Sequence, residues 1–230
     1  MPINRASFLS ASLAAMGTAA SPALAAAPSG SAPAAAGQSP QQLLDRLMAG
    51  NRRFVNTDFP VQNRVAEKRE LLRDTQAPFA AILTCADSRV IPNLIFVQGL
   101  GDLFVTRVAG NYPDDLVTGS IEYSIEHLGS RVVMVLGHQN CGAIKAVYSA
   151  SDDHQMLPPH LITIQRLIAP GIQSVVQSKG TIRAAIDANV RAAKEVLATT
   201  SPIIDNAVKS GKVLLVGAVY KLGTGEVALL

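Results

Sequence analysis

Residues 79–89 read FAAILTCADSR and residues 132–142 read VVMVLGHQNCG, and these two stretches decide the fold. Each begins with a short, nearly continuous apolar run that includes β-branched residues, which is typical of a parallel strand buried on both faces. Each then changes to polar and chemically reactive residues. Because functional residues of open α/β sheets collect just beyond the carboxyl ends of the strands, we expect both polar stretches at that edge of one sheet.

Strand-like apolar runs and helix-like amphipathic stretches alternate along the rest of the chain. Further strands are predicted at Leu103–Arg107, at Val213–Tyr220 and, as a hairpin edge strand, at Val227–Leu230. Helical patterns fall at residues 117–128, 142–150, 158–168 and 181–199. This alternation predicts an α/β fold with a mainly parallel β-sheet flanked by helices.

Composition indicates one compact domain. The chain has 230 residues, 48% of them hydrophobic, which is enough for a sizeable core and too short for two full-sized domains. The formal net charge of +3 is mild, and the chain has no Trp and few other aromatic residues to stack on bases. Nucleic-acid binding is therefore not expected.

Residues 1–27 have the pattern of a cleavable export signal. They contain one charge, Arg5, then an apolar Ala-rich stretch and small residues at the spacing that signal peptidases require. The apolar run is too short and too weakly hydrophobic for a stable membrane anchor. The residues around Arg5 resemble a degenerate twin-arginine signal with Asn4 in place of the first arginine, and an ordinary Sec signal fits as well. We expect an exported protein, periplasmic in a bacterium.

Residues 28–38 are small, uncharged and proline-containing, as in a flexible linker. The folded domain is expected at residues 39–230. Ser39 supplies an N-cap and Pro40 a first helical residue, and leucines at helical spacing carry the helix toward Phe54. This segment is expected to form an N-terminal helical arm.

The two cysteines of the chain, Cys85 and Cys141, follow predicted strands, and His138 stands three residues before Cys141. Two thiolates and an imidazole suit zinc, and three protein ligands leave a fourth position open, as in catalytic sites. The alternatives are a disulfide, the usual state of a cysteine pair in an exported protein, and a structural zinc site, which needs a fourth donor. The use of both cysteines at two predicted strand ends favours the open site, with one Zn²⁺ per chain.

Over nearly all of residues 39–230 the chain resembles the β-class carbonic anhydrases. The motifs that carry the resemblance are GNRRF at 50–54, LTCADSRV at 83–90, GLGDLFV at 99–105, GSIEY at 119–123, GHQNCGA at 137–143 and VGAVY at 216–220. The resemblance implies reversible hydration of carbon dioxide to bicarbonate and a proton, by attack of a zinc-bound hydroxide. It also implies a homodimer or homotetramer, with the active site at the interface and helical arms that wrap the partner subunit.

Asp87 and Arg89 are predicted to form a catalytic dyad beside Cys85. Arg89 would keep the Asp87 carboxylate ionised and oriented, and Asp87 would accept a hydrogen bond from the zinc-bound hydroxide. The alternative is a surface salt bridge of little consequence, and the position next to a predicted ligand favours the dyad. The resemblance also implies that in some relatives this aspartate becomes a fourth zinc ligand in a closed state, when its pairing with the arginine breaks.

The resemblance implies substrate contacts at four further residues. Gln76 would hydrogen-bond substrate across a dimer interface, Phe104 and Tyr123 would line the apolar pocket for carbon dioxide, and the N–H of Gly142 would lie near the substrate. As ordinary structural residues they would be a loop amide, two core aromatics and a glycine at a helix start.

Other functions stay open at this point. The same scaffold hydrolyses carbon disulfide or carbonyl sulfide in some relatives. A non-catalytic exported zinc-binding protein is a second alternative, although such a protein has no use for Asp87 and Arg89. A disulfide-stapled exported binding module is the third.

Overall fold

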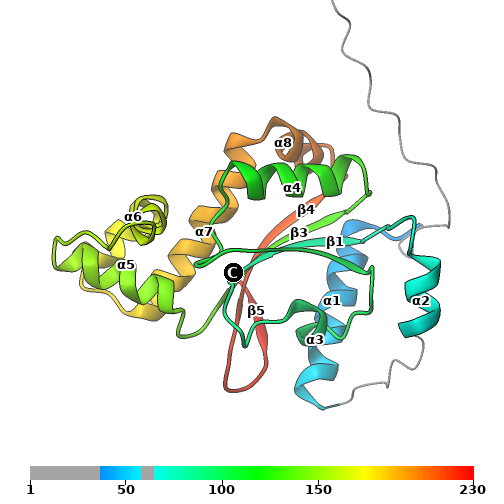
Figure 1. The fold of residues 1–230 in the computed structure, drawn as a ribbon, viewed down its shortest axis with the longest axis horizontal. Coiled ribbons are helices and arrows are strands. Elements are labelled where there is room, and N and C mark those ends of the chain that lie inside the picture. Colours follow the sequence, from blue (N-terminus) through cyan, green and yellow to red (C-terminus); the bar gives the residue numbers. More distant parts are fainter. Residues whose placement is uncertain (1–36, 58–64) are drawn as a thin grey trace, which may run out of the picture.

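The computed structural model describes residues 37–57 and 65–230 (Figure 1). The predicted export signal, residues 1–27, lies outside the described residues, and so do residues 28–36 of the predicted linker. Among the helices of the described part, none combines the length and the apolar character needed to cross a membrane.

Within the described residues, five strands form one sheet in the order β2-β1-β3-β4-β5. The strands are β1 (Ala80–Thr84), β2 (Leu103–Arg107), β3 (Val132–His138), β4 (Leu214–Tyr220) and β5 (Val227–Leu229). The first four are parallel, and β5 runs antiparallel to β4. The predicted mainly parallel sheet and the predicted hairpin edge strand are both confirmed.

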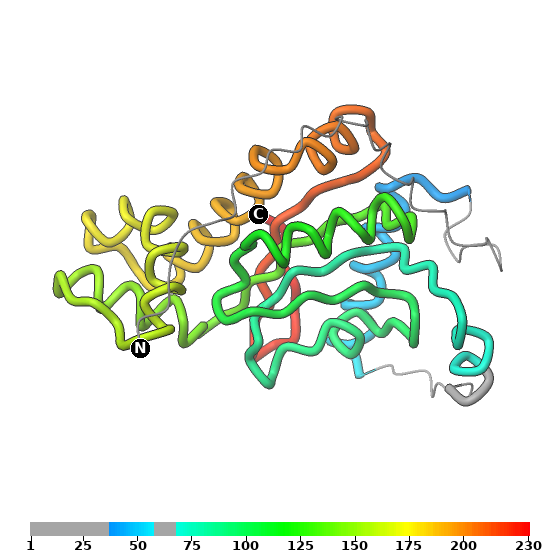
Figure 2. Tube along the Cα trace, turned by 45° about the horizontal axis from the view of Figure 1, so that its top comes forward, coloured from blue at the N-terminus to red at the C-terminus, as the bar shows by residue number. Residues whose placement is uncertain are grey.

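Helices cover both faces of the sheet (Figure 1). One face packs against α1 and α3, and the other against α4, α7 and α8. Helices α5 and α6 pack beside α7 and extend beyond the sheet, as both views show (Figures 1 and 2). The helices are α1 (Pro40–Val55), α2 (Val65–Leu71), α3 (Pro92–Ile95), α4 (Asp115–Glu126), α5 (Gly142–Asp152), α6 (Leu161–Gln177), α7 (Ile182–Thr200) and α8 (Pro202–Lys209).

The strands contribute side chains to two apolar cores, one on each face of the sheet, because successive side chains of a strand point to opposite faces. Ala81 and Leu83 of β1 join the cluster under α4 and α7, whereas Ala80 and Ile82 join the cluster under α1. All residues of β1 and β3 are buried, as expected for central strands with helices on both sides. The residues of β2, at the sheet edge, are only partly buried or exposed.

The predicted N-terminal helical arm corresponds to α1. Ser39 caps it, and a capping box with Gln42 completes the helix start. Leu43 and Leu47 of α1 are fully buried against the chain's own sheet. The side chain of Asn51 also ties α1 to the β4–β5 hairpin, by accepting from the N–H of Val227 at 2.8 Å.

The structure extends the sequence prediction in the helical regions. The stretch predicted at 158–168 continues to Gln177 through Pro170, which removes one helical hydrogen bond. Gly171 follows, and a Cβ there would lie 2.6 Å from that of Ala192, so α6 and α7 approach closely at this point. Packing against α7 therefore supports the helix past its proline. Helices α2, α3 and α8 were not predicted, since each is too short to show a clear helical period.

The chain changes direction across the sheet at β1. From β1 it crosses to β2 through α3 on one face, and from β2 it crosses to β3 through α4 on the other face. β2 and β3 thus lie on opposite sides of β1. The connection after β1 leads to β2 on one side, and the connection after β3 leads to β4 on the other side. This is the topological switch point at which α/β sheets place their functional sites.

Candidate metal centre

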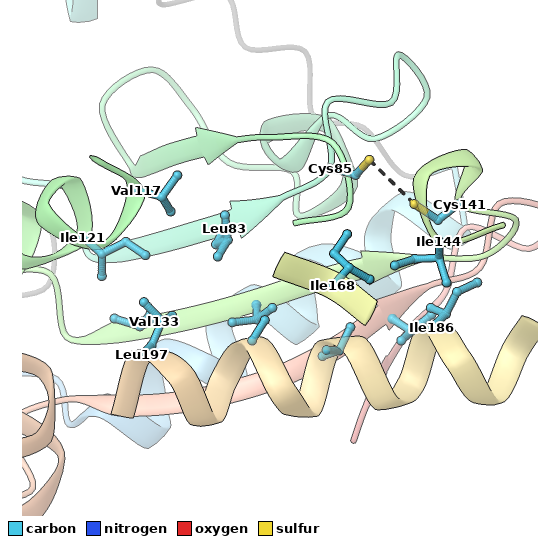
Figure 3. Close-up of a cluster of buried hydrophobic side chains, with 14 of the residues drawn as sticks. Leu83, Cys85, Val117, Ile121, Val133, Cys141, Ile144, Ile168, Ile186 and Leu197 are labelled. Carbon is cyan, nitrogen blue, oxygen red and sulfur yellow. Dashed lines mark hydrogen bonds between the residues drawn. The ribbon is translucent and has the colours of Figure 1, made fainter. Parts of the chain in front are cut away.

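Three side chains with metal-binding atoms meet at this switch point. Cys85 directly follows β1, His138 is the last residue of β3, and Cys141 immediately precedes α5. All three are buried, with exposures of 5%, 0% and 1% in that order. Their ligand atoms lie within 4.8 Å of one another. Figure 3 shows the two cysteines at one end of the apolar cluster, with their sulfur atoms facing each other.

The distance between the two sulfur atoms distinguishes a metal site from a disulfide. Sγ of Cys85 lies 3.9 Å from Sγ of Cys141, and both cysteines are free. A disulfide requires about 2.05 Å. Tetrahedral zinc with bonds of about 2.3 Å to sulfur would separate two thiolates by roughly 3.8 Å. The spacing in this chain therefore fits a shared metal ion.

His138 offers the third ligand atom. Its Nδ1 lies 2.9 Å from the main-chain oxygen of Gln139, which fixes the ring and assigns the proton to Nδ1. Its Nε2 is buried and has no hydrogen-bond partner within the described residues. A buried nitrogen acceptor without a partner is costly, and a metal ion would satisfy it. The donor set and this orphan nitrogen together fit Zn²⁺.

The two thiols interact strongly with each other. A hydrogen bond from the Cys141 thiol lowers the pKa of Cys85 to about 4; burial opposes this shift, and His138 and the N–H of Gly110 add to it. The same hydrogen bond, with burial, raises the pKa of Cys141. These shifts predict that Cys85 is the thiolate of the pair, and a thiolate is the form of cysteine that binds metal.

Asp87 and Arg89 form the predicted pair beside the ligands. Arg89 donates from Nη2 to Oδ2 of Asp87 at 2.7 Å, and from Nε and its main-chain N–H to Oδ1 at 2.9 Å each. These hydrogen bonds hold the pKa of the Asp87 carboxyl well below its usual range, although its burial acts the other way. Oδ2 of Asp87 lies 3.9 Å from Nε2 of His138. The carboxylate is therefore ionised and lies next to the ligand cluster.

Arg107 is a site residue that the sequence prediction missed. It ends β2 and donates from Nε to the main-chain oxygen of Cys85 at 3.2 Å and from Nη2 to that of Asp87 at 2.7 Å. A signal was present in the sequence, since a charged residue ends a strand that begins with three apolar residues. That signal does not assign Arg107 to the site, because the sequence alone does not show that β2 lies beside β1.

The four residues predicted to contact substrate divide into two groups. Gly142 begins α5, directly after the last metal ligand. The other three lie toward the opposite, amino edge of the sheet. Gln76 is exposed and precedes β1, Phe104 is the second residue of β2, and Tyr123 lies in the last turn of α4. Within one chain, the structure does not bring these three to the metal ligands.

Comparisons with known proteins agree with this geometry. A family model described as "Carbonic anhydrase" matches residues 80–227. The curated carbonic anhydrase of Mycolicibacterium smegmatis is 34% identical over 186 residues, which cover 80% of this chain and 89% of the relative.

Solved structures give the same result. The β-carbonic anhydrase CcaA superposes with a TM-score of 0.65 at 27% identity, covering 82% of this chain and 87% of that one. A tetrameric β-carbonic anhydrase of Sordaria macrospora has a TM-score of 0.65 at 22% identity, over 82% of this chain and 97% of that one. At that identity the second match bears on the fold alone.

Proposed function

The chain belongs to the β-class carbonic anhydrases, zinc enzymes that interconvert carbon dioxide and bicarbonate, and we propose that Asp87 and Arg89 are the dyad that directs its reaction. Cys85, His138 and Cys141 would hold the zinc ion. Bound zinc lowers the pKa of a water ligand to about 7 and so supplies a nucleophile at neutral pH.

The observation that carries this proposal is the arrangement of Asp87. Arg89 donates to both carboxylate oxygens, and Oδ2 also faces Nε2 of His138 at 3.9 Å. Because the pKa of Asp87 is lowered, the carboxylate is ionised at neutral pH and can only accept hydrogen bonds. An attacking water would therefore turn its hydrogen toward Asp87 and its lone pair toward carbon dioxide.

Gly142 is placed to bind the anionic product of the reaction. Its N–H is the first of α5, and the first N–H groups of a helix have no partner within the helix. Such groups favour anions. We assign the N–H of Gly142 to bicarbonate, which is the anionic form of the substrate pair.

A second copy of the chain would complete the site. β2 is an edge strand, and apolar side chains lie exposed on the two helices that flank it: Leu94 of α3 is 53% exposed and Leu116 of α4 is 83% exposed. A strand that pairs with its own copy across a two-fold axis runs antiparallel to it. The amino edge of one sheet then lies beside the carboxyl edge of the other.

Such a pairing accounts for the three residues that lie far from the metal ligands in one chain. Gln76, Phe104 and Tyr123 lie toward the amino edge, and a homodimer would carry the partner's copies toward this chain's Cys85. A homotetramer could form from two such dimers. The apolar exposure around β2 supports a homo-oligomer of this kind.

Stopped-flow hydration of carbon dioxide tests the function. We expect the zinc-loaded protein to be active, and Asp87→Asn to lose roughly 10²- to 10⁴-fold in turnover while it keeps its zinc. An inactive wild type carrying one zinc per chain between about pH 6.5 and 9, where its metal-bound water should ionise, would refute the proposal. Parallel assays with carbonyl sulfide and carbon disulfide would show whether the scaffold prefers those substrates.

We also propose that the protein is exported, from the sequence pattern of residues 1–27. Sequencing the amino terminus of the protein recovered from a bacterial periplasm tests this. Retention in the cytoplasm with residues 1–27 intact would contradict it. Blocking the Sec pathway separates the two routes, because twin-arginine export would persist.

A further inference from the structure

Arg107 connects the edge strand of the sheet to the loop that carries both a metal ligand and the dyad. In the parallel ladder it is paired with Thr84, the last residue of β1. Its side chain continues beyond the ladder, and its guanidinium donates to the main-chain oxygens of Cys85 and Asp87. Hydrogen bonds from a charged guanidinium are stronger than those from neutral donors. The main chain between the ligand and the carboxylate is thus anchored at both ends.

Arg89 cannot provide this anchor. It belongs to the same loop as Asp87, two residues further along, and its side chain is 55% exposed. If the loop shifts toward His138, Arg89 can shift with it. Arg107 belongs to a different element, β2, whose position is fixed by the sheet. Of the two arginines, Arg107 therefore ties the main chain of the loop to a neighbouring strand, and Arg89 does not.

We propose that Arg107 is a positioning residue, which keeps Asp87 paired with Arg89 and out of the metal's coordination sphere by anchoring the main chain of Cys85 and Asp87 to β2. The inference rests on the proposed role of Asp87. Oδ2 of Asp87 is already 3.9 Å from Nε2 of His138, so a small shift of the loop would bring the carboxylate into the ligand cluster. Arg107 thereby keeps the fourth coordination position free for small molecules.

This role has a measurable consequence for ligands other than substrate. An external anion such as azide can bind the metal only when Asp87 does not occupy the fourth position. Its apparent dissociation constant is the intrinsic constant divided by the open fraction, so a site that becomes 90% closed would bind azide about tenfold more weakly. Zinc is spectroscopically silent, whereas cobalt(II) at the same ligands reports such binding by its visible absorption.

The experiment is an azide titration of the cobalt-substituted full chain. Arg107→Gln should weaken azide binding by about tenfold or more. Arg107→Lys keeps the charge but loses the planar, paired contact. Its affinity for azide should lie between those of the wild type and Arg107→Gln. The double variant Arg107→Gln/Asp87→Asn should bind azide as Asp87→Asn alone does, since an amide is a poor metal ligand. Arg131→Gln is the matched control, because Arg131 donates to a main-chain oxygen, that of Gln38, at the other end of the sheet.

Two results would overturn the proposal. One is wild-type azide binding by Arg107→Gln. The other is weak binding that Asp87→Asn does not restore, because this would indicate a disordered loop rather than a closed site. If Arg107→Gln does not retain cobalt, Arg107→Lys is judged by the same two criteria. The dyad is tested separately: full turnover of zinc-loaded Asp87→Asn would refute it whatever the azide titration shows.

Discussion

The sulfur atoms of Cys85 and Cys141 lie 3.9 Å apart although the two residues are 56 positions apart in the chain. The carboxyl ends of β1 and β3 bring them together, and the central position of both strands fixes their separation. The spacing fits two ligands of one zinc ion and leaves the sulfurs too far apart for a disulfide.

Replacing one sulfur should therefore remove the metal. We expect Cys141→Ser to fall from about one zinc per chain to almost none and to lose hydration activity with it. Metal analysis of the purified protein measures this, with circular dichroism as the check that the fold persists. Ser149→Ala, on the exposed side of α5, is the matched control and should keep its zinc. Full zinc occupancy in Cys141→Ser would exclude Cys141 as a ligand.

The metal-free protein should hold one thiolate per chain at pH 7. The pKa of Cys85 is lowered to about 4 by the Cys141 thiol, and that of Cys141 is raised. Absorbance near 240 nm, which reports thiolate, should persist in the folded chelated protein down to about pH 4. In the unfolded chain it should disappear below about pH 8.5.

The same shift predicts a pH-dependent contribution to stability. Because the pKa of Cys85 is lower in the folded state, its ionisation stabilises the fold fully above about pH 8.5, and this contribution is lost as the pH falls toward 4.

Cys85→Ser should abolish the thiolate absorbance of the metal-free protein at pH 7. A variant that retained it would show that Cys141 carries the thiolate instead.

The sequence was sufficient for the sheet and the metal ligands but not for the surroundings of the site. The apolar runs before Cys85 and His138 are short, nearly continuous and include β-branched residues, which identifies them as strands, and the strand ends locate the ligands. The role of Arg107 depends on which strand lies beside β1, and that order is set by packing between distant elements. Helix α6 likewise continues beyond the predicted end at residue 168 and through Pro170, because contact with α7 outweighs the local effect of the proline.

Replacing either of two helical glycines by alanine should change the free energy of unfolding, in opposite directions. A Cβ on Gly50 of α1 would lie 1.7 Å from the main-chain oxygen of Phe96, whereas one on Gly119 of α4 would meet nothing within 4 Å. Gly50→Ala should lower the free energy of unfolding by about 1–3 kcal/mol or more, because the helix must move off α3. Gly119→Ala should raise it by about 0.5–1 kcal/mol through helix propensity. Urea unfolding measures both, and equal effects would contradict the contact at Gly50.

If the proposed dimer forms through β2, charges introduced beside this strand should separate the subunits. Leu94→Glu/Leu116→Glu places two carboxylates among exposed apolar side chains that flank the edge strand. Burying unpaired charges in an interface is costly, so light scattering should show a shift toward monomer. Leu161→Glu, at a residue 48% exposed on α6, is the matched control and should leave the assembly intact. If Gln76 and Phe104 reach the site from the partner, the separated monomer should keep its zinc and lose hydration activity. A fully active wild-type monomer would contradict the shared site.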